Sequence, residues 1–245
     1  MFGEIASIYR ASKKKVDINF FTEWVCRPKA AAIVYLLEDT RVTPNQVTFL
    51  SILVCAGACA LFVWIPGWPG AVAGAATLHV SYLLDCADGM LSRQRKSSSV
   101  LGHLLDFLMD EIKAFMVFAA VTIRLWLYSG DTYFLVCGLG GLVALSSGIA
   151  ITSFTRRPEY GAKQPTADGQ PHESKRRLGV VGLAIGSFEA AARLLVHYPQ
   201  YTWICAIFDR MDVYFWAYGG VNILYLGYMF LGILVKLGRF EPRAQ

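Results

Sequence analysis

Apolar residues gather in long runs along this chain, and short polar segments separate the runs. Six runs have the length of about 20 residues that an α-helix needs to cross the hydrocarbon layer of a membrane. They cover residues 43–65, 71–91, 101–127, 133–154, 186–208 and 213–237. The pattern therefore predicts an all-α integral membrane protein with six transmembrane helices. Thr43 and Pro44 are expected to cap and begin the first helix.

The segment before the first run, residues 19–37, has a different pattern, because charged residues interrupt the apolar ones. This mixture is typical of an amphipathic helix that lies in the membrane interface. Pro28 is expected to break or kink this interfacial helix, since proline removes a backbone donor and clashes with the preceding turn. A membrane-spanning signal anchor is the alternative, but charges interrupt the run too often for one.

Composition supports the membrane prediction. The chain has 245 residues, of which 55% are hydrophobic and 17% are charged. A soluble domain carries about 25% charged residues, so an ordinary water-soluble globule is excluded. We expect a single membrane domain over residues 1–245. Residues 1–42 form its N-terminal interfacial segment, residues 43–237 its six-helix bundle and residues 238–245 a tail.

Basic residues are unevenly distributed between the two sides of the predicted bundle. They are Lys13, Lys14, Lys15, Arg27, Lys29 and Arg41 before the first run, Arg93, Arg95 and Lys96 after the second, Arg156, Arg157, Lys163, Lys175, Arg176 and Arg177 after the fourth, and Lys236, Arg239 and Arg243 at the end. By the positive-inside rule, both termini and these connections are cytoplasmic. The net charge of +5 is thus explained by topology, without a nucleic-acid partner. The small size favours a bacterial inner membrane over the endoplasmic reticulum.

Four aspartates lie near the cytoplasmic ends of the second and third runs. Asp85 and Asp88 are three residues apart, and Asp106 and Asp110 are four apart, so each pair shares one helix face. The short polar loop 94–99 makes the two helices antiparallel neighbours. The four carboxylates can therefore converge on one site at the membrane boundary.

Carboxylates in that position are costly, because one ionised aspartate at the centre of a membrane helix costs about 3 kcal/mol. Arg93 and Lys113 cannot balance four aspartates together with Glu111, which argues against a merely structural polar patch. Bound divalent cations solve the problem, and an all-oxygen ligand set favours Mg²⁺, Mn²⁺ or Ca²⁺ over zinc. Two such ions, about 4 Å apart, are a common device for displacement at phosphorus.

Three other residues suit a phosphate ligand beside these acids. Gly89 and Gly102 remove side chains where a ligand or a neighbouring helix approaches closely. Arg93 offers a planar, permanently charged fork to a phosphate at the rim of the site.

These residues stand at the spacing of a known signature, Asp-x2-Asp-Gly-x2-Ala-Arg-x8-Gly-x3-Asp-x3-Asp. The chain therefore resembles the CDP-alcohol phosphotransferase family. The matching residues are Asp85, Asp88, Gly89, Arg93, Gly102, Asp106 and Asp110. Ser92 replaces the usual alanine, and it is nearly as small. The six-span plan and the preceding interfacial helix extend the resemblance over most of the chain.

The resemblance implies a specific reaction in phospholipid biosynthesis. A hydroxyl of an acceptor alcohol attacks the β-phosphorus of a CDP-linked alcohol, CMP leaves, and a phosphodiester forms. By position, Asp85, Asp88 and Asp106 are implied as the main metal ligands. Asp110 is implied as the general base and as a further metal ligand. Gly89, Arg93 and Gly102 are implied to bind the CDP-alcohol, and the family implies a homodimer.

Three basic residues are candidates for binding the acceptor. Arg156 and Arg157 follow the fourth run and could hold a phosphate on the acceptor, with topological charge as the alternative. Lys113 lies one turn beyond Asp110 and could steer an anionic acceptor, although a counter-ion to the acids is the favoured alternative.

The sequence leaves the identity of the donor and the acceptor open. CDP-diacylglycerol with a small polar acceptor is favoured by analogy within the family. A CDP-linked choline, ethanolamine or inositol with a lipid or soluble acceptor is the alternative. A divalent-cation transporter is a remote alternative, because all four acids cluster at one end of the bundle. An inactive relative is also disfavoured, because the four acids are intact.

Overall fold

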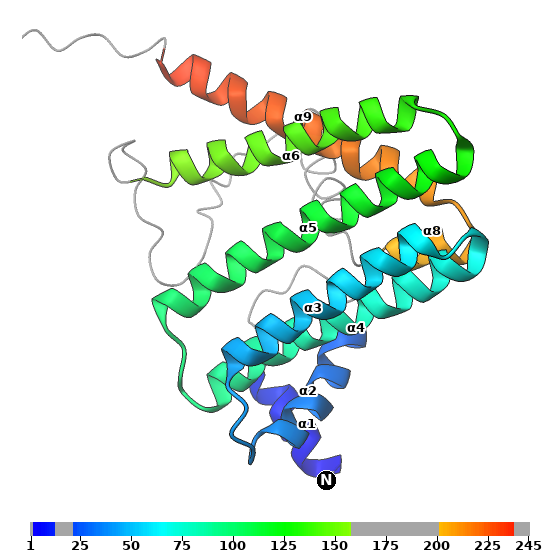
Figure 1. Ribbon diagram of the computed structural model, residues 1–245. Helices are drawn as coiled ribbons and strands as arrows, with labels where there is room; N and C mark the ends of the chain where they lie inside the picture. The colour runs from blue at the N-terminus through cyan, green and yellow to red at the C-terminus, as the bar shows by residue number, and fades with distance from the viewer. Residues whose placement is uncertain (1, 13–21, 158–200, 238–245) are drawn as a thin grey trace, which may run out of the picture. The chain divides into compact units, whose positions relative to one another are not determined.

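The computed structural model describes residues 2–12, 22–157 and 201–237, which form helices joined by short connections (Figure 1). No β-strand occurs in these three ranges, so the all-helical prediction is confirmed there. The elements are α1 (Phe2–Ser12), the π-helix η1 (Thr22–Cys26), α2 (Arg27–Leu37), α3 (Pro44–Trp64), α4 (Gly67–Gln94), α5 (Val100–Ser129), α6 (Tyr133–Thr155), α8 (Thr202–Ile207) and α9 (Met211–Leu237).

Five of the six predicted transmembrane runs correspond to α3, α4, α5, α6 and α9. Among the described helices, three are long and apolar enough to cross a membrane by themselves, at Pro44–Trp64, Tyr133–Thr155 and Met211–Leu234. The fifth run, residues 186–208, lies mostly outside the described residues, and only α8 at its end is seen. The apolar helices thus identify an integral membrane protein.

The second helix begins earlier than the predicted run at residues 71–91, because α4 already begins at Gly67. Gly67 has a φ of 65°, which glycine adopts without strain. Pro69 lies in the first turn of α4, where a proline sacrifices no helical hydrogen bond. The α3–α4 connection is therefore shorter than the gap between the first two predicted runs.

The N-terminal segment also differs from its prediction. Helix α1 has no counterpart in the sequence analysis, because residues 2–12 are short and mixed in character. Pro28 lies in the first turn of α2, directly after η1. The helical backbone thus passes from a π-helix to an α-helix at this position, and Pro28 makes no gap in it.

The described helices belong to two compact units. The first unit comprises residues 1–135 and 197–215, and the second comprises residues 136–196 and 216–245. Helices α1 to α5 and α8 lie in the first unit. The unit holds all four aspartates of the motif, so it also contains the candidate site.

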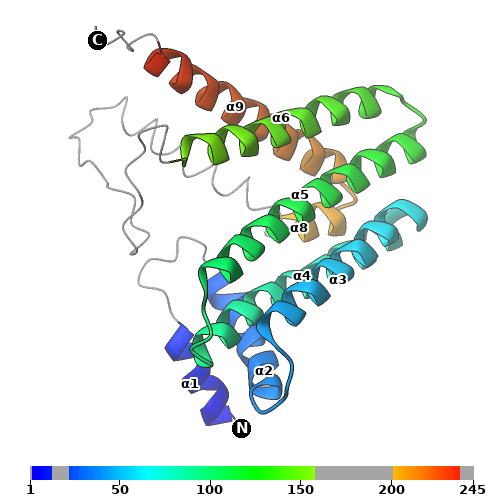
Figure 2. The ribbon, with the colours of Figure 1, turned by 60° about the vertical axis from the view of Figure 1, so that its left-hand side comes forward.

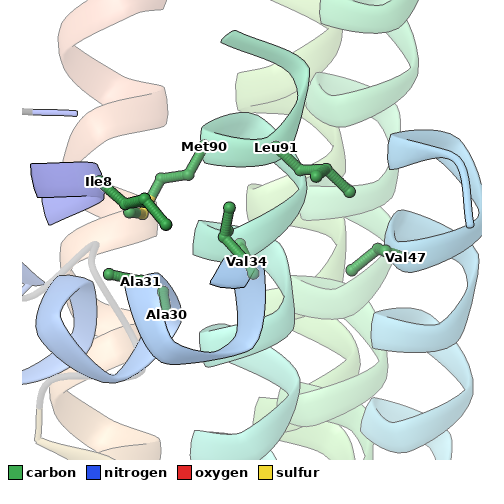
Figure 3. Close-up of a cluster of buried hydrophobic side chains, with 8 residues drawn as sticks. Ile8, Ala30, Ala31, Val34, Val47, Met90 and Leu91 are labelled. Atoms are coloured by element: carbon green, nitrogen blue, oxygen red, sulfur yellow. The ribbon is translucent and has the colours of Figure 1, made fainter. Parts of the chain in front are cut away.

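In the first unit, α3, α4 and α5 run side by side, and α1 and α2 pack at the end of α4 (Figures 1 and 2). A cluster of buried apolar side chains joins these helices (Figure 3). Its members are Ile8, Ala30, Ala31, Val34, Val47, Ala87, Met90 and Leu91. The alanines let α2 approach α4 closely, and the cluster fixes the N-terminal helices beside the acidic motif.

The start of α3 is fixed by its cap, as the sequence predicts. The side chain of Thr43 accepts a hydrogen bond from the backbone amide of Gln46, and the Gln46 side chain accepts one from the amide of Thr43. This reciprocal capping box satisfies two amides that the first turn leaves without helical partners. Pro44 occupies the first helical position.

Two arginines tie backbone segments together at opposite ends of the α3–α4 pair. The Arg95 guanidinium donates to the carbonyl oxygens of Glu38 at 3.1 Å and Thr40 at 2.9 Å, and also to those of Leu37 and Val42. The Arg124 guanidinium donates to the carbonyl oxygens of Phe62 (2.8 Å), Ile65 (3.1 Å) and Gly67. Each arginine satisfies carbonyls at or near a helix end.

In the second unit, α6 and α9 meet at Tyr225. The hydroxyl groups of Thr152 and Tyr225 share a hydrogen bond of 2.8 Å. A Cβ atom at Gly148 would lie 3.2 Å from the ring of Tyr225, so the absence of a side chain permits this contact.

We predict that Arg95→Ala lowers the thermal unfolding midpoint by about 4–8 °C, because the linker between α2 and α3 loses its charged donor. Thermal unfolding in detergent measures this. Arg41→Ala is the matched control, since it removes an exposed arginine of the same linker. Equal midpoints for the two variants would contradict the anchoring role of Arg95.

Candidate functional site

Three of the four motif aspartates converge in the first unit. Asp85 and Asp88 on α4 and Asp106 on α5 each offer one carboxylate oxygen, and these oxygens all lie within 4.8 Å of one another. The predicted convergence is thus confirmed for these three residues. Oxygens at this spacing can bind a common cation, and carboxylates are the ligands that Mg²⁺ and Mn²⁺ prefer.

Asp110 occupies a different position from the three converging carboxylates, which we call the aspartate cluster. It lies one helical turn beyond Asp106 on α5, and its Oδ1 is 3.2 Å from the Nζ of Lys113. Its side chain is 53% exposed. Asp110 can therefore meet a substrate from solvent, whereas its predicted role as a metal ligand stays a prediction.

Lys113 connects Asp110 to the aspartate cluster. Its side chain is 2% exposed, and its ammonium group contacts both Asp85 and Asp110. These contacts are those of a counter-ion, the alternative that the sequence favoured. A buried ammonium with two carboxylate partners offsets the repulsion between those carboxylates. The predicted contact between Lys113 and the acceptor stays a prediction.

Thr48 is a neighbour of the cluster that sequence reasoning missed. Its hydroxyl group donates a hydrogen bond from α3 to Oδ2 of Asp88. Thr48 and Asp88 are 5% and 4% exposed. A hydroxyl residue in an apolar run gives a weak signal in sequence, because such residues often bond only to their own helix. The contact appears only once α3 is placed against α4.

Arg93 folds back over Gly89. A Cβ atom at Gly89 would lie 3.4 Å from the Nη1 of Arg93, so the missing side chain leaves room for the guanidinium. A cavity of about 330 Å³ opens beside Arg93, between the end of α4 and α1. Met90 and Gln94 line it from α4, and Ser12 is among the lining residues from α1.

Gly102 lies in the first turn of α5. Its amide donates to the side chain of Ser99 at 3.0 Å, and this bond caps the helix. A Cβ atom at Gly102 would lie 3.2 Å from the Oγ of Ser99. The structure thus gives Gly102 a capping environment, and its predicted role in binding the CDP-alcohol stays a prediction.

The other acceptor candidates lie in the second unit. Arg156 and Arg157 follow the last turn of α6, and the remainder of that basic loop falls outside the described residues. Their predicted contact with the acceptor therefore stays a prediction.

Comparison with known proteins relates the chain to one family. The sequence model of the family described as CDP-alcohol phosphatidyltransferase matches residues 41–208, which include the entire acidic motif. Among curated proteins, no sequence relative is found.

Solved structures show the same fold. Phosphatidylinositol phosphate synthase of Mycobacterium tuberculosis with CDP-DAG bound is 20% identical, with a TM-score of 0.55 over 88% of this chain and 98% of that one. The apo form of that synthase is 20% identical, with a TM-score of 0.52 over 83% and 95% of the two chains. At this level of identity the likeness establishes a shared fold.

We predict that Lys113→Met lowers the unfolding midpoint of the metal-free protein by about 10 °C, because it leaves two carboxylates without their buried cation. Mg²⁺ should raise the midpoint of this variant more than that of the wild type. Thermal unfolding with chelator and with Mg²⁺ measures both effects. Lys96→Met, at an exposed lysine, is the control. A midpoint unchanged in chelator would contradict the counter-ion role.

Proposed function

The chain belongs to the CDP-alcohol phosphatidyltransferase family, and from this premise we propose that it transfers a phosphatidyl group from CDP-diacylglycerol to a small polar alcohol. Membership makes the protein a CDP-alcohol phosphotransferase of phospholipid biosynthesis. The observation that carries the proposal is the convergence of the carboxylates of Asp85, Asp88 and Asp106. That arrangement suits a diphosphate with its cations.

The choice of donor rests on similarity. The synthase from M. tuberculosis was solved with CDP-DAG bound and shares the fold of this chain. We therefore favour CDP-diacylglycerol, with an acceptor of the inositol phosphate, glycerol phosphate or serine class. A CDP-linked choline, ethanolamine or inositol is the alternative donor.

The aspartate cluster fits a divalent cation. Its three converging carboxylates supply only oxygen donors, and their negative charges repel one another unless a cation is bound. We propose that Asp85, Asp88 and Asp106 hold Mg²⁺ or Mn²⁺, and that Asp110 joins them where two ions bind. Such ions supply charge neutralisation and alignment of oxygens at phosphorus.

Asp110 is proposed as the general base. The acceptor hydroxyl oxygen attacks the β-phosphorus, and its proton moves to the Asp110 carboxylate. The bond between the β-phosphorus and the bridging oxygen breaks, and CMP leaves with that oxygen. The 53% exposure of the Asp110 side chain supports this role, since a base must come within hydrogen-bond reach of its substrate.

Arg93, Gly89 and Gly102 are proposed to bind the CDP-alcohol. The guanidinium of Arg93 lies at a cavity beside the motif, where it can donate a pair of hydrogen bonds to a phosphate. Arg156 and Arg157 are proposed to hold a phosphate of the acceptor, and Lys113 to add positive charge near it. These assignments follow from side-chain chemistry and from the motif.

The wider architecture is proposed from the sequence pattern. Six transmembrane helices with an N-terminal amphipathic interfacial helix would place the aspartates and both termini on the cytoplasmic side of a bacterial inner membrane. A lipid donor could then enter from the leaflet and the polar acceptor from water. The protein is proposed to act as a homodimer.

We predict that the purified protein in detergent with Mg²⁺ releases CMP from CDP-diacylglycerol when a matching acceptor is present. CMP is measured for this donor and for CDP-choline, CDP-ethanolamine and CDP-inositol, each against a panel of alcohols. A chelator should abolish the release. CMP release from a different donor would show that the proposed donor is wrong. If the protein bound none of the CDP-alcohols, the alternative of a divalent-cation transporter would be favoured.

We predict that Asp110→Asn lowers turnover by about 10²–10⁴-fold while CDP-alcohol binding persists, because only the proton acceptor is lost. Asp88→Ala should instead lose metal-dependent nucleotide binding. CMP release and equilibrium binding separate the two effects. Asp131→Asn, outside the motif, is the control. Full activity of either motif variant would contradict its assigned role.

A further inference from the structure

We infer that Thr48 is a positioning residue for the metal site, because its hydroxyl group orients the carboxylate of Asp88 from the neighbouring helix. This inference rests on the proposed metal-dependent function. Thr48 belongs to α3, outside the acidic motif, which lies on α4 and α5.

The hydrogen bond from Thr48 makes the two oxygens of the Asp88 carboxylate different from each other. The Thr48 hydroxyl donates to Oδ2 of Asp88. Oδ2 is thereby engaged, and Oδ1 keeps its full capacity to bind a cation. A hydrogen bond to an ionised acceptor is stronger than one between neutral groups. The bond therefore selects one orientation of the Asp88 side chain.

The hydroxyl group of Thr48 has a second acceptor in reach, the carbonyl oxygen of Pro44 at 3.2 Å. A hydroxyl carries one proton, so it donates to one acceptor at a time. The ionised carboxylate attracts that proton more strongly than a neutral carbonyl does. The Pro44 carbonyl thus keeps the hydroxyl nearby without replacing Asp88 as its partner.

The backbone that carries Thr48 is itself held in place. The Oγ of Ser51 donates to the carbonyl oxygen of Thr48 at 2.7 Å, and the Oγ of Ser81 on α4 donates to that of Ser51 at 2.6 Å. Ser51 and Ser81 are 0% and 1% exposed. The capping box of Thr43 and Gln46 fixes the start of the same helix. Thr48 therefore meets Asp88 from a rigid support.

A purely structural role predicts a different result from a positioning role. If Thr48 only satisfied a buried polar group, its loss would lower stability and leave cation affinity alone. Groups that orient a metal ligand typically change metal affinity or activity by 10–100-fold when they are removed. The affinity of the site for a cation therefore distinguishes the two roles.

The test is a titration of the full-length protein in detergent with Mn²⁺ alone, followed through the electron paramagnetic resonance signal of free Mn²⁺. Thr48→Val should raise the Mn²⁺ dissociation constant by about 10-fold or more. Thr48→Ser, which keeps the hydroxyl, should bind Mn²⁺ as the wild type does. Thr48→Ala repeats the loss of the hydroxyl, so the comparison holds even where the valine variant does not fold.

Thr122→Val is the matched control, because it removes a buried threonine hydroxyl of the same unit that bonds to the carbonyl oxygen of Phe118 on its own helix, away from Thr48 and the aspartates. It should leave Mn²⁺ binding unchanged. Wild-type affinity in Thr48→Val and Thr48→Ala, or weakened binding in Thr48→Ser, would overturn the inference. The titration contains no substrate, so its result is independent of whether the protein releases CMP. A wild-type protein that binds no Mn²⁺ would overturn both the proposed metal site and this inference.

Discussion

Repulsion among three carboxylates in an apolar helix bundle is the constraint on which the site depends. Asp85, Asp88 and Asp106 present oxygens within 4.8 Å of one another, and like charges at such distances destabilise each other. Within the described residues, the ammonium group of Lys113 and the hydroxyl group of Thr48 stabilise two of these carboxylates, those of Asp85 and Asp88. A divalent cation bound among the three carboxylates would offset their mutual repulsion further.

The support of the site comes from backbone contacts at some distance from the acids. Arg95 donates hydrogen bonds to carbonyl oxygens of the α2–α3 linker, and Arg124 donates them to carbonyl oxygens around the α3–α4 turn. The two ends of the α3–α4 pair are thus fixed independently of the carboxylates. Geometry that is held in this way does not relax when the acids repel one another, which is the condition for a preorganised cation site.

Sequence patterns predicted the features that depend on local chemistry. The cap at Thr43 and the helices around the motif follow from spacing and residue type, and so does the meeting of Asp85 with Asp106. Thr48 and Arg95 could not be predicted, because their partners are 40 or more residues away in the chain. Helix α1 escaped prediction for the opposite reason, since packing on α2 and α4 stabilises a segment whose own pattern is weak.

The separation of Asp110 from the cluster has a physical origin in α5. Asp106 and Asp110 share a helix face, but one turn moves a side chain about 5.4 Å along the axis, and Lys113 holds Asp110 at 3.2 Å. The same ammonium contacts Asp85. A cation bound at Asp85 would share that carboxylate with Lys113, whose ammonium contacts Oδ1. Because the same ammonium contacts Asp110, the charge at the proposed metal site and the environment of the proposed base are linked through a single side chain.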